Sequence, residues 1–272
     1  MVCRTLYGSC VGEQAQALGA EFGQNVIVWA DADAVPQLIS SMPKLVVHVP
    51  HASCAIPDDA WPEFLFPRAA VEAEALESAD LHTDEMARQA WPLAEIVEAD
   101  VSRIVVDVER YDDDSKEEMA EVGRGVFYAC DHQMRPIRNA LTEVRRDELL
   151  DRYYRPHWKQ LRAKAADAVL VDLHTYPAEP WPIERHAHGP RPEIDIGFSE
   201  GLTPPAWVEA LTEHFRLHGY EVGHNTPYVG VIDAGAKAAV MIEIRRDVVG
   251  APSGDPKWQR LIAALSTMPI GV

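Results

Sequence analysis

The chain has 272 residues, of which 47% are hydrophobic and 25% charged, and its formal net charge is −18 at pH 7. This length is enough to bury a substantial core, as one large domain or two small ones. The acidic balance argues against binding to nucleic acid or to an anionic membrane, because both need a basic protein face. A small anionic substrate is compatible with it, since a few arginines can form a positive pocket within a negative surface.

Four scattered cysteines without C-x-x-C spacing argue against a disulfide framework. No stretch approaches the roughly 20 apolar residues of a transmembrane helix, and the N-terminus lacks the pattern of a signal peptide. We therefore expect a cytoplasmic enzyme. Residues 1–43 are predicted to be an N-terminal extension packed on or near the main domain, and residues 44–272 are predicted to form the catalytic domain.

Apolar, β-branched runs predict strands, and segments rich in Ala, Glu, Leu and Met predict helices. In chain order, the predicted strands cover Asn25–Trp29, Leu45–Val49, Ile104–Val108, Val169–Leu173, Tyr220–Val222 and Val240–Ile244. The predicted helices cover Val71–Leu93, Arg138–Ala166 with an interruption at Pro156, Pro205–His218 and Lys257–Leu265, and Glu13–Phe22 is compatible with a short helix. Strands that alternate with helices predict an α/β fold, here a single-domain three-layer α/β/α sandwich with a mixed, mostly parallel sheet.

Two of the predicted strands end close to a histidine, His51 after LVVHVP and His174 after VLVDL. Ligands of open α/β sheets bind outside the carboxyl ends of the strands. Each histidine alone is more often a hydrogen-bonded structural residue, but two such strand ends can converge. Two imidazoles and one carboxylate leave a coordination position open for water, which is the pattern of a catalytic zinc site. We therefore predict one Zn²⁺ per chain, with other divalent metals as alternatives, and a hydrolytic reaction.

The third ligand must come from another segment. Asp80 and Asp84 in SADLHTDEM are the best candidates, and at a spacing of four they would share one helix face. The alternative for both is an exposed helix face. Asp172 should point to the same side as His174 and could orient a ligand, whereas His48 inside its strand is interpreted as a core residue or a support of the ligands.

One acid and two arginines complete the candidate site. Glu243 in VMIEIRR is costly to bury without a partner or a task, so it could take a proton from the attacking water and pass it to the leaving amine. The alternative is a buried ion pair with Arg245. Arg103 and Arg110 bracket IVVDV, and arginine binds carboxylates through two parallel hydrogen bonds. The alternative for these two is a pair of surface salt bridges.

The motifs PHASCAIP, SADLHTDEM, SRIVVDVER, VLVDLHTYP, IDIGFSEG, HGYEVGHNTPYVG and MIEIRRD follow one another along the chain. This ordered set resembles the N-formylglutamate amidohydrolase family, and the resemblance extends from about Lys44 to Val248. It implies a zinc-carboxypeptidase-like (phosphorylase/hydrolase-like) fold. It also implies metal-dependent cleavage of the N-formyl or another N-acyl amide of an acidic amino acid, so that the partner is a small anionic substrate.

Carried over onto this sequence, the resemblance implies metal ligation by His51, His174 and Asp84, with Asp80 as the alternative third ligand. It implies that Glu243 is the general acid and base.

It further implies that Arg103 and Arg110 bind the substrate carboxylate and that Asn225 lies in a loop near the pocket, with Tyr228 and Gly230 close behind. The sequence departs from the family at Glu109, where members commonly carry Asn, and a negative side chain there would alter the charge of the pocket. Two other functions stay open: a carboxypeptidase-like or desuccinylase-like hydrolase of another acyl-amino compound or small peptide, and a non-catalytic binding protein.

Overall fold

The computed structural model describes residues 19–22, 26–29, 43–185 and 189–271. The chain divides into two compact units, Met1–Met42 and Pro43–Val272. In the first unit, β1 (Gly19–Phe22) and β2 (Val26–Trp29) pair in antiparallel orientation. The strand predicted over Asn25–Trp29 is therefore present, and Gly19–Phe22 is a strand rather than the end of a helix. The remainder of that helix lies outside the described residues, and the packing of residues 1–43 on the catalytic domain stays a prediction.

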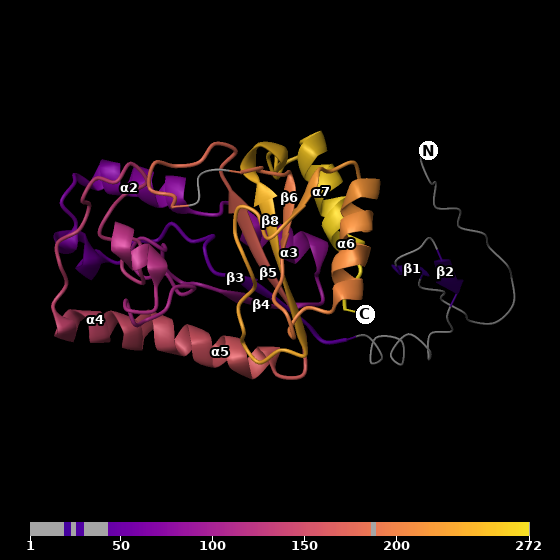
Figure 1. Cartoon of the computed structure of the whole chain (residues 1–272), viewed down its shortest axis with the longest axis horizontal. Helices are drawn as coiled ribbons and strands as arrows, with labels where there is room; N and C mark the ends of the chain where they lie inside the picture. Colours follow the sequence, from indigo (N-terminus) through magenta and orange to yellow (C-terminus); the bar gives the residue numbers. More distant parts are fainter. Residues whose placement is uncertain (1–18, 23–25, 30–42, 186–188, 272) are drawn as a thin grey trace, which may run out of the picture. The chain divides into compact units, whose positions relative to one another are not determined.

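A six-stranded sheet in the order β4-β3-β5-β8-β6-β7 forms the centre of the second unit (Figure 1). Its strands are β3 (Leu45–Val49), β4 (Glu95–Glu98), β5 (Val169–Tyr176), β6 (Ile194–Gly197), β7 (Val222–His224) and β8 (Ala238–Arg245). Every neighbouring pair is parallel except β6 and β8, which are antiparallel. The predicted α/β fold with a mixed, mostly parallel sheet is thus confirmed.

Helices cover both faces of this sheet (Figure 1). On one face lie α3 (Thr83–Ala90), α6 (Pro205–Leu217) and α7 (Pro256–Ser266), and on the other lies α5 (Arg155–Ala165). The first face holds the larger apolar core, in which Trp207 of α6 and Leu261 of α7 are buried with the strand residues. The second face has a smaller core around Leu161 of α5. None of the helices in the described part of the chain is long and apolar enough to cross a membrane.

A loop-rich lobe beside the sheet has a separate apolar core. It contains the helices α2 (Arg68–Ser78) and α4 (Glu143–Leu149) and the short 3₁₀ segments η1 (Asp58–Glu63) and η2 (Glu118–Val122). A further 3₁₀ segment, η4 (Arg246–Val248), follows β8. The strand predicted over Ile104–Val108 is wrong, because this run forms turns. The side chains of Ile104, Val105 and Val106 are buried in the core of the lobe rather than in the sheet, which periodicity alone could not distinguish.

Two of the predicted helices are each divided into two helices in the structure. The helix predicted over Val71–Leu93 is two helices, α2 and α3, separated by a turn that ends at His82 with a left-handed φ of 68°. The helix predicted over Arg138–Ala166 is α4 and α5 joined by the π-helical turn η3 (Leu150–Tyr154). This wider turn ends two residues before Pro156 and accommodates a residue that has no N–H to donate.

Candidate metal centre and active site

The candidate site lies on the face of the sheet that α5 covers. Near the start of the strands, Val46, Leu170 and Ala239 belong to the apolar core beside Leu161. Side chains on one face recur every second residue, so this face continues with His48, Asp172 and Met241 and then with His174 and Glu243. The face therefore changes from apolar to polar toward the carboxyl ends of the strands, which is where ligands bind in such sheets.

Two ring nitrogens and one carboxylate oxygen converge at this edge. The Nδ1 atoms of His51 and His174 lie 3.3 Å apart. Oδ2 of Asp80 lies 3.1 Å from Nδ1 of His174 and 3.4 Å from Nδ1 of His51. Tetrahedral zinc with bonds of about 2.0–2.2 Å places its ligand atoms roughly 3.3–3.6 Å apart. All three residues are almost fully buried, and this donor set fits a catalytic zinc ion.

The structure separates the two aspartates that the sequence left as alternatives. Asp80 lies in the turn between α2 and α3, and its backbone N–H donates to the carbonyl of His51 at 2.9 Å. Asp84 lies within α3, and its carboxylate pairs with Arg88 at 2.9 Å on the surface. The chain thus brings Asp80, and not Asp84, to the two histidines.

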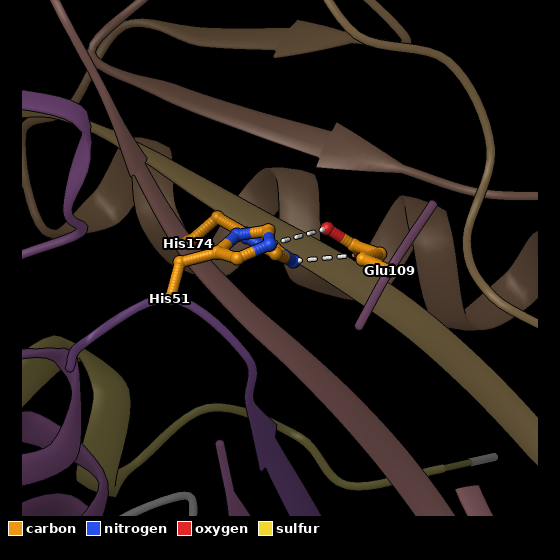
Figure 2. Close-up of side chains that lie close together, drawn as sticks. All are labelled: His51, Glu109 and His174. Carbon is orange, nitrogen blue, oxygen red and sulfur yellow. Dashed lines mark hydrogen bonds and ion pairs between the residues drawn. The ribbon is translucent and has the colours of Figure 1, made fainter. Parts of the chain in front are cut away.

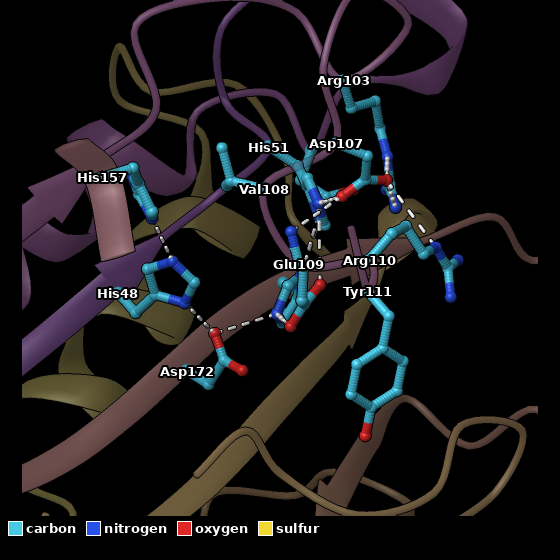
Figure 3. Close-up of polar contacts among 12 residues, drawn as sticks. His48, His51, Arg103, Asp107, Val108, Glu109, Arg110, Tyr111, His157 and Asp172 are labelled. Atoms are coloured by element: carbon cyan, nitrogen blue, oxygen red, sulfur yellow. Dashed lines mark hydrogen bonds and ion pairs between the residues drawn. The ribbon is translucent and has the colours of Figure 1, made fainter. Parts of the chain in front are cut away.

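The Nε2 atoms of both rings face further carboxylates (Figures 2 and 3). Nε2 of His51 is hydrogen-bonded to Oδ1 of Asp107 at 2.9 Å, and Nε2 of His174 lies 3.0 Å from Oδ1 of Asp172. Glu109 reaches both rings, with Oε1 at 3.1 Å from His174 Nε2 and Oε2 at 3.6 Å from His51 Nε2. Carboxylates that bind the second nitrogen of a ligand histidine fix the orientation of the ring.

Glu109 also offers an alternative ligand set, because its carboxylate lies within metal-binding reach of both histidines. We favour Asp80 for a geometric reason. Nε2 of His51 is hydrogen-bonded to Asp107, and Nε2 of His174 lies 3.0 Å from Asp172 without a hydrogen bond in the described part of the chain. The two Nδ1 atoms instead converge on each other and on Asp80 at 3.1–3.4 Å, which is the spacing of ligands around one ion.

Arg103 and Arg110 both approach Asp107, but they do so differently. Arg103 donates from Nε and Nη2 to Oδ2 of Asp107 at 3.0 and 2.9 Å, and Tyr128 donates to the same oxygen at 2.9 Å. The nearest carboxylates to Arg110 are longer contacts, at 3.8 Å to Asp107 and 3.5 Å to Glu117. Arg103 therefore holds Asp107, whereas the guanidinium of Arg110 keeps capacity for another anion.

The buried charges shift one another's pKa values. Burial alone would raise the pKa of Asp80, but hydrogen bonds from His174 and His51 lower it well below its usual range. Burial would lower the pKa of His174, but the charges of Glu109 and Asp172 and the hydrogen bonds to Asp172 and Asp80 raise it well above its usual value. Both shifts show that this site favours positive charge at the rings.

Glu243 is a different kind of acid. It stands opposite His174 in the register of β5 and β8, and its Oε2 has no hydrogen-bond partner in the part of the chain that the structure describes. Burial raises its pKa to about 8. The alternative of an ion pair with Arg245 is not what the structure shows, because Arg245 binds Asp247 at 2.7 Å and the carbonyl of Arg191.

These residues open into a cavity of about 1360 Å³. The predicted site residues that line it are His51, Asp80, Arg103, Arg110, His174 and Glu243, together with Glu109. Asn225 is not among the lining residues. Its side chain instead accepts from the backbone of Phe198 and Gly230 and so holds the loop that carries Tyr228 to the cavity.

Sequence reasoning missed Asp107, which lies inside an apolar run that was interpreted as a strand. The signal that singled out Glu243, an acid within an apolar run, applies equally to Asp107. The carboxyl of Asp195 was also missed. It is fully buried opposite Glu243 in the register of β6 and β8, and burial raises its pKa to about 7.

Comparison with known proteins agrees with this architecture. The chain is 22% identical to the N-formylglutamate amidohydrolase of Ralstonia eutropha JMP134, with a TM-score of 0.68 over 82% of this chain and 90% of that one. It is 18% identical to a gene product of Agrobacterium tumefaciens, with a TM-score of 0.62 over 83% and 87% of the two chains. At these identities the likeness concerns the fold. No curated protein sequence matches the chain.

The sequence profile of one family, described as N-formylglutamate amidohydrolase, matches residues 43–249. This range includes every residue of the site described above and three quarters of the chain. The chain therefore belongs to the N-formylglutamate amidohydrolase family.

Proposed function

We propose that the protein is a zinc-dependent amidohydrolase that removes the N-formyl, or another N-acyl, group from an acidic amino acid or a related small molecule. The observation that carries this proposal is the convergence of the two Nδ1 atoms and the Asp80 carboxylate at mutual distances of 3.1–3.4 Å. His51, Asp80 and His174 would hold the ion. Zinc at this position would lower the pKa of a bound water to about 7 and polarise the substrate carbonyl.

Glu243 is the proposed general base and acid. Its Oε2 has no hydrogen-bond partner among the described residues, and Glu243 lines the same cavity as His174, one strand away. A carboxyl group with a pKa of about 8 exchanges its proton near neutral pH, as this role requires. Glu243 would take a proton from the attacking water and deliver it to the nitrogen of the leaving amine, so that a carboxylic acid and a free amino compound are formed.

Arg110 is the proposed partner of the substrate carboxylate, because its carboxylate contacts are loose and it lines the cavity. We assign Arg103 to holding Asp107, which in turn orients His51. Glu109 lies against both rings, so its charge would repel a carboxylate placed directly beside them. The substrate carboxylate is therefore proposed to lie on the Arg110 side of the cavity.

The test is a panel of N-formyl, N-acetyl and N-succinyl amino acids assayed with zinc, with amine release as the readout. Hydrolysis by the wild type that is lost in His174→Ala together with bound zinc, but kept in His214→Ala on α6, supports the proposal. Glu243→Gln should keep zinc and lose turnover, whereas Glu213→Gln, an exposed change on α6, should keep both.

A preference for succinyl or peptide substrates would favour the carboxypeptidase-like or desuccinylase-like alternative. Absence of both zinc and hydrolysis would favour a binding protein. A cytoplasmic location stays a prediction.

A further inference from the structure

Two buried histidines behind the metal centre have no part in the proposed reaction. His48 in β3 and His157 in α5 are 0% and 6% exposed, and their Nε2 atoms lie 2.8 Å apart. Nδ1 of His48 lies 2.8 Å from Oδ1 of Asp172, the same oxygen that lies 3.0 Å from Nε2 of His174. Figure 3 shows this series running from His157 through His48 to Asp172.

The surroundings make these two polar rings unusual. The neighbouring residues on the same face, Val46 and Leu170, are apolar and fully buried, as is Leu161 one turn along α5. Burying imidazole here is costly unless each ring is hydrogen-bonded. Burial lowers the pKa of His157 to about 3, so this ring is neutral. His48 contacts Asp172 and His157 through its two ring nitrogens, and the backbone of Glu98 is a further hydrogen-bond partner of His157.

The series fixes the position of a single oxygen atom. Oδ2 of Asp172 has no hydrogen-bond partner within the described segments, so Oδ1 is the oxygen that His48 holds, at 3.0 Å from Nε2 of His174. A carboxylate oxygen accepts, so we assign the proton of this bond to Nδ1 of His48.

The continuous helical segment formed by η3 and α5 also contacts the loop that carries Glu109. The indole of Trp158 donates to the carbonyl of Val108 at 2.7 Å, and the hydroxyl of Tyr154 donates to the carbonyl of Arg110 at 2.8 Å. These two bonds flank Glu109 in the sequence. Tyr154, His157 and Trp158 of the η3–α5 segment therefore contact both the loop that bears Glu109 and the support of His174.

We propose that His48 and His157 are positioning residues for the metal ligand His174, acting through Asp172. By holding Oδ1 of Asp172 at 3.0 Å from Nε2 of His174, where Oε1 of Glu109 also lies at 3.1 Å, they favour the proton of that ring on Nε2 and leave Nδ1 as the ligand atom. Outer partners of this kind are worth about 10–100-fold in metal affinity. This inference rests on the proposed function, because it requires that His174 binds a metal.

The test measures zinc affinity by chelator competition in His48→Leu, His157→Leu and the double variant. We expect about 10–100-fold weaker binding for His48→Leu and a smaller loss for His157→Leu. Because His157 acts through His48, the double variant should bind no more weakly than His48→Leu. His157→Gln, which can still hydrogen-bond, should recover part of the affinity. His214→Leu is the matched control, since His214 bonds the carbonyl of Ala264 on the other side of the sheet.

Folding and metal binding separate in this design. The double variant removes both rings of the His48–His157 bond but leaves the buried carboxylate of Asp172 without its His48 donor, so the metal-free variant should melt at a lower temperature than the wild type. Zinc affinity is therefore compared at a temperature well below the melting temperature of every variant. Additive losses of affinity in the double variant, or unchanged affinity in His48→Leu, would overturn the proposal. If the wild type binds no zinc, the proposed function fails, and crystal structures of the metal-free proteins decide this inference separately. His48→Leu should then show Asp172 turned away from His174, and an unmoved Asp172 would refute the positioning role.

Discussion

Asp80→Asn is the sharpest test of the metal centre. Asp80 contacts Nδ1 of both histidines, whereas Asp84, four residues on, pairs with Arg88 at the surface. Asparagine keeps the size of the side chain but removes the charge that a divalent cation requires. Loss of an outer partner costs about 10–100-fold in metal affinity, so loss of a ligand should cost at least about 100-fold. That factor corresponds to about 2.7 kcal/mol of binding free energy.

The assay is competition for zinc with a chromophoric chelator, in parallel with thermal unfolding of the metal-free proteins. Asp84→Asn is the matched control, because it makes the same chemical change in the same segment. An exposed pair at this spacing contributes about 0.3–0.5 kcal/mol to folding, so this variant should keep its zinc affinity and nearly all its stability. Equal zinc affinity in Asp80→Asn and the wild type would refute the ligand assignment. A loss of zinc affinity in Asp84→Asn alone would contradict the placement of Asp84 at the surface of α3.

Three further outcomes are expected. Glu243→Gln should reduce kcat by about 10²–10⁴-fold with zinc still bound, measured by metal analysis and steady-state kinetics, and retained kcat would exclude Glu243 as the proton carrier. In metal-free protein, the folded-state pKa of Glu243 is raised from its ordinary 4.5 to about 8, so its protonation stabilises the fold fully below pH 4.5 and this stability is lost as the pH rises to about 8. Urea unfolding from pH 5 to 8 should therefore show a steeper fall in the wild type than in Glu243→Gln, and parallel curves would contradict the shift. Arg110→Ala should raise KM for carboxylate substrates about tenfold or more, whereas Arg152→Ala, which removes an exposed partner of Asp59, should not.

The sequence predicted the parts of the site that follow from strand periodicity. Buried parallel strands are continuous apolar runs, so a histidine at the end of such a run is visible without a structure. His174 and Asp172 lie on the same face because side chains alternate between the two faces of a strand. Glu243 was visible for a related reason, because a lone acid in an apolar strand needs a task or a partner.

Tertiary contacts decided the parts that the sequence left open. On a continuous helix, Asp80 and Asp84 are equally good candidates for the third ligand. The structure distinguishes them because the helix is interrupted at Asp80, whose backbone N–H donates to the carbonyl of the distant residue His51. Asp107 was hidden because its apolar neighbours fill the core of the lobe rather than a strand. The strand β4 was missed because only its Val97 is fully buried, so its pattern lacks the apolar run of the central strands.

The balance of charge at the site connects the metal, the substrate and the acidity of the chain. Among the described residues, four carboxylates contact the two histidine rings: Asp80, Asp107, Glu109 and Asp172. Three guanidinium groups lie within 4 Å of these carboxylates: Arg103, Arg110 and Arg246. Glu117, which lies 3.5 Å from Arg110, adds a fifth carboxylate, so these groups carry two net negative charges when the rings are neutral. The raised pKa of His174 reduces this charge by protonation in the metal-free protein. Under the proposed function, a divalent cation in place of that proton would neutralise the group, so that an anionic substrate could bind on the Arg110 side of the cavity although the chain as a whole carries −18.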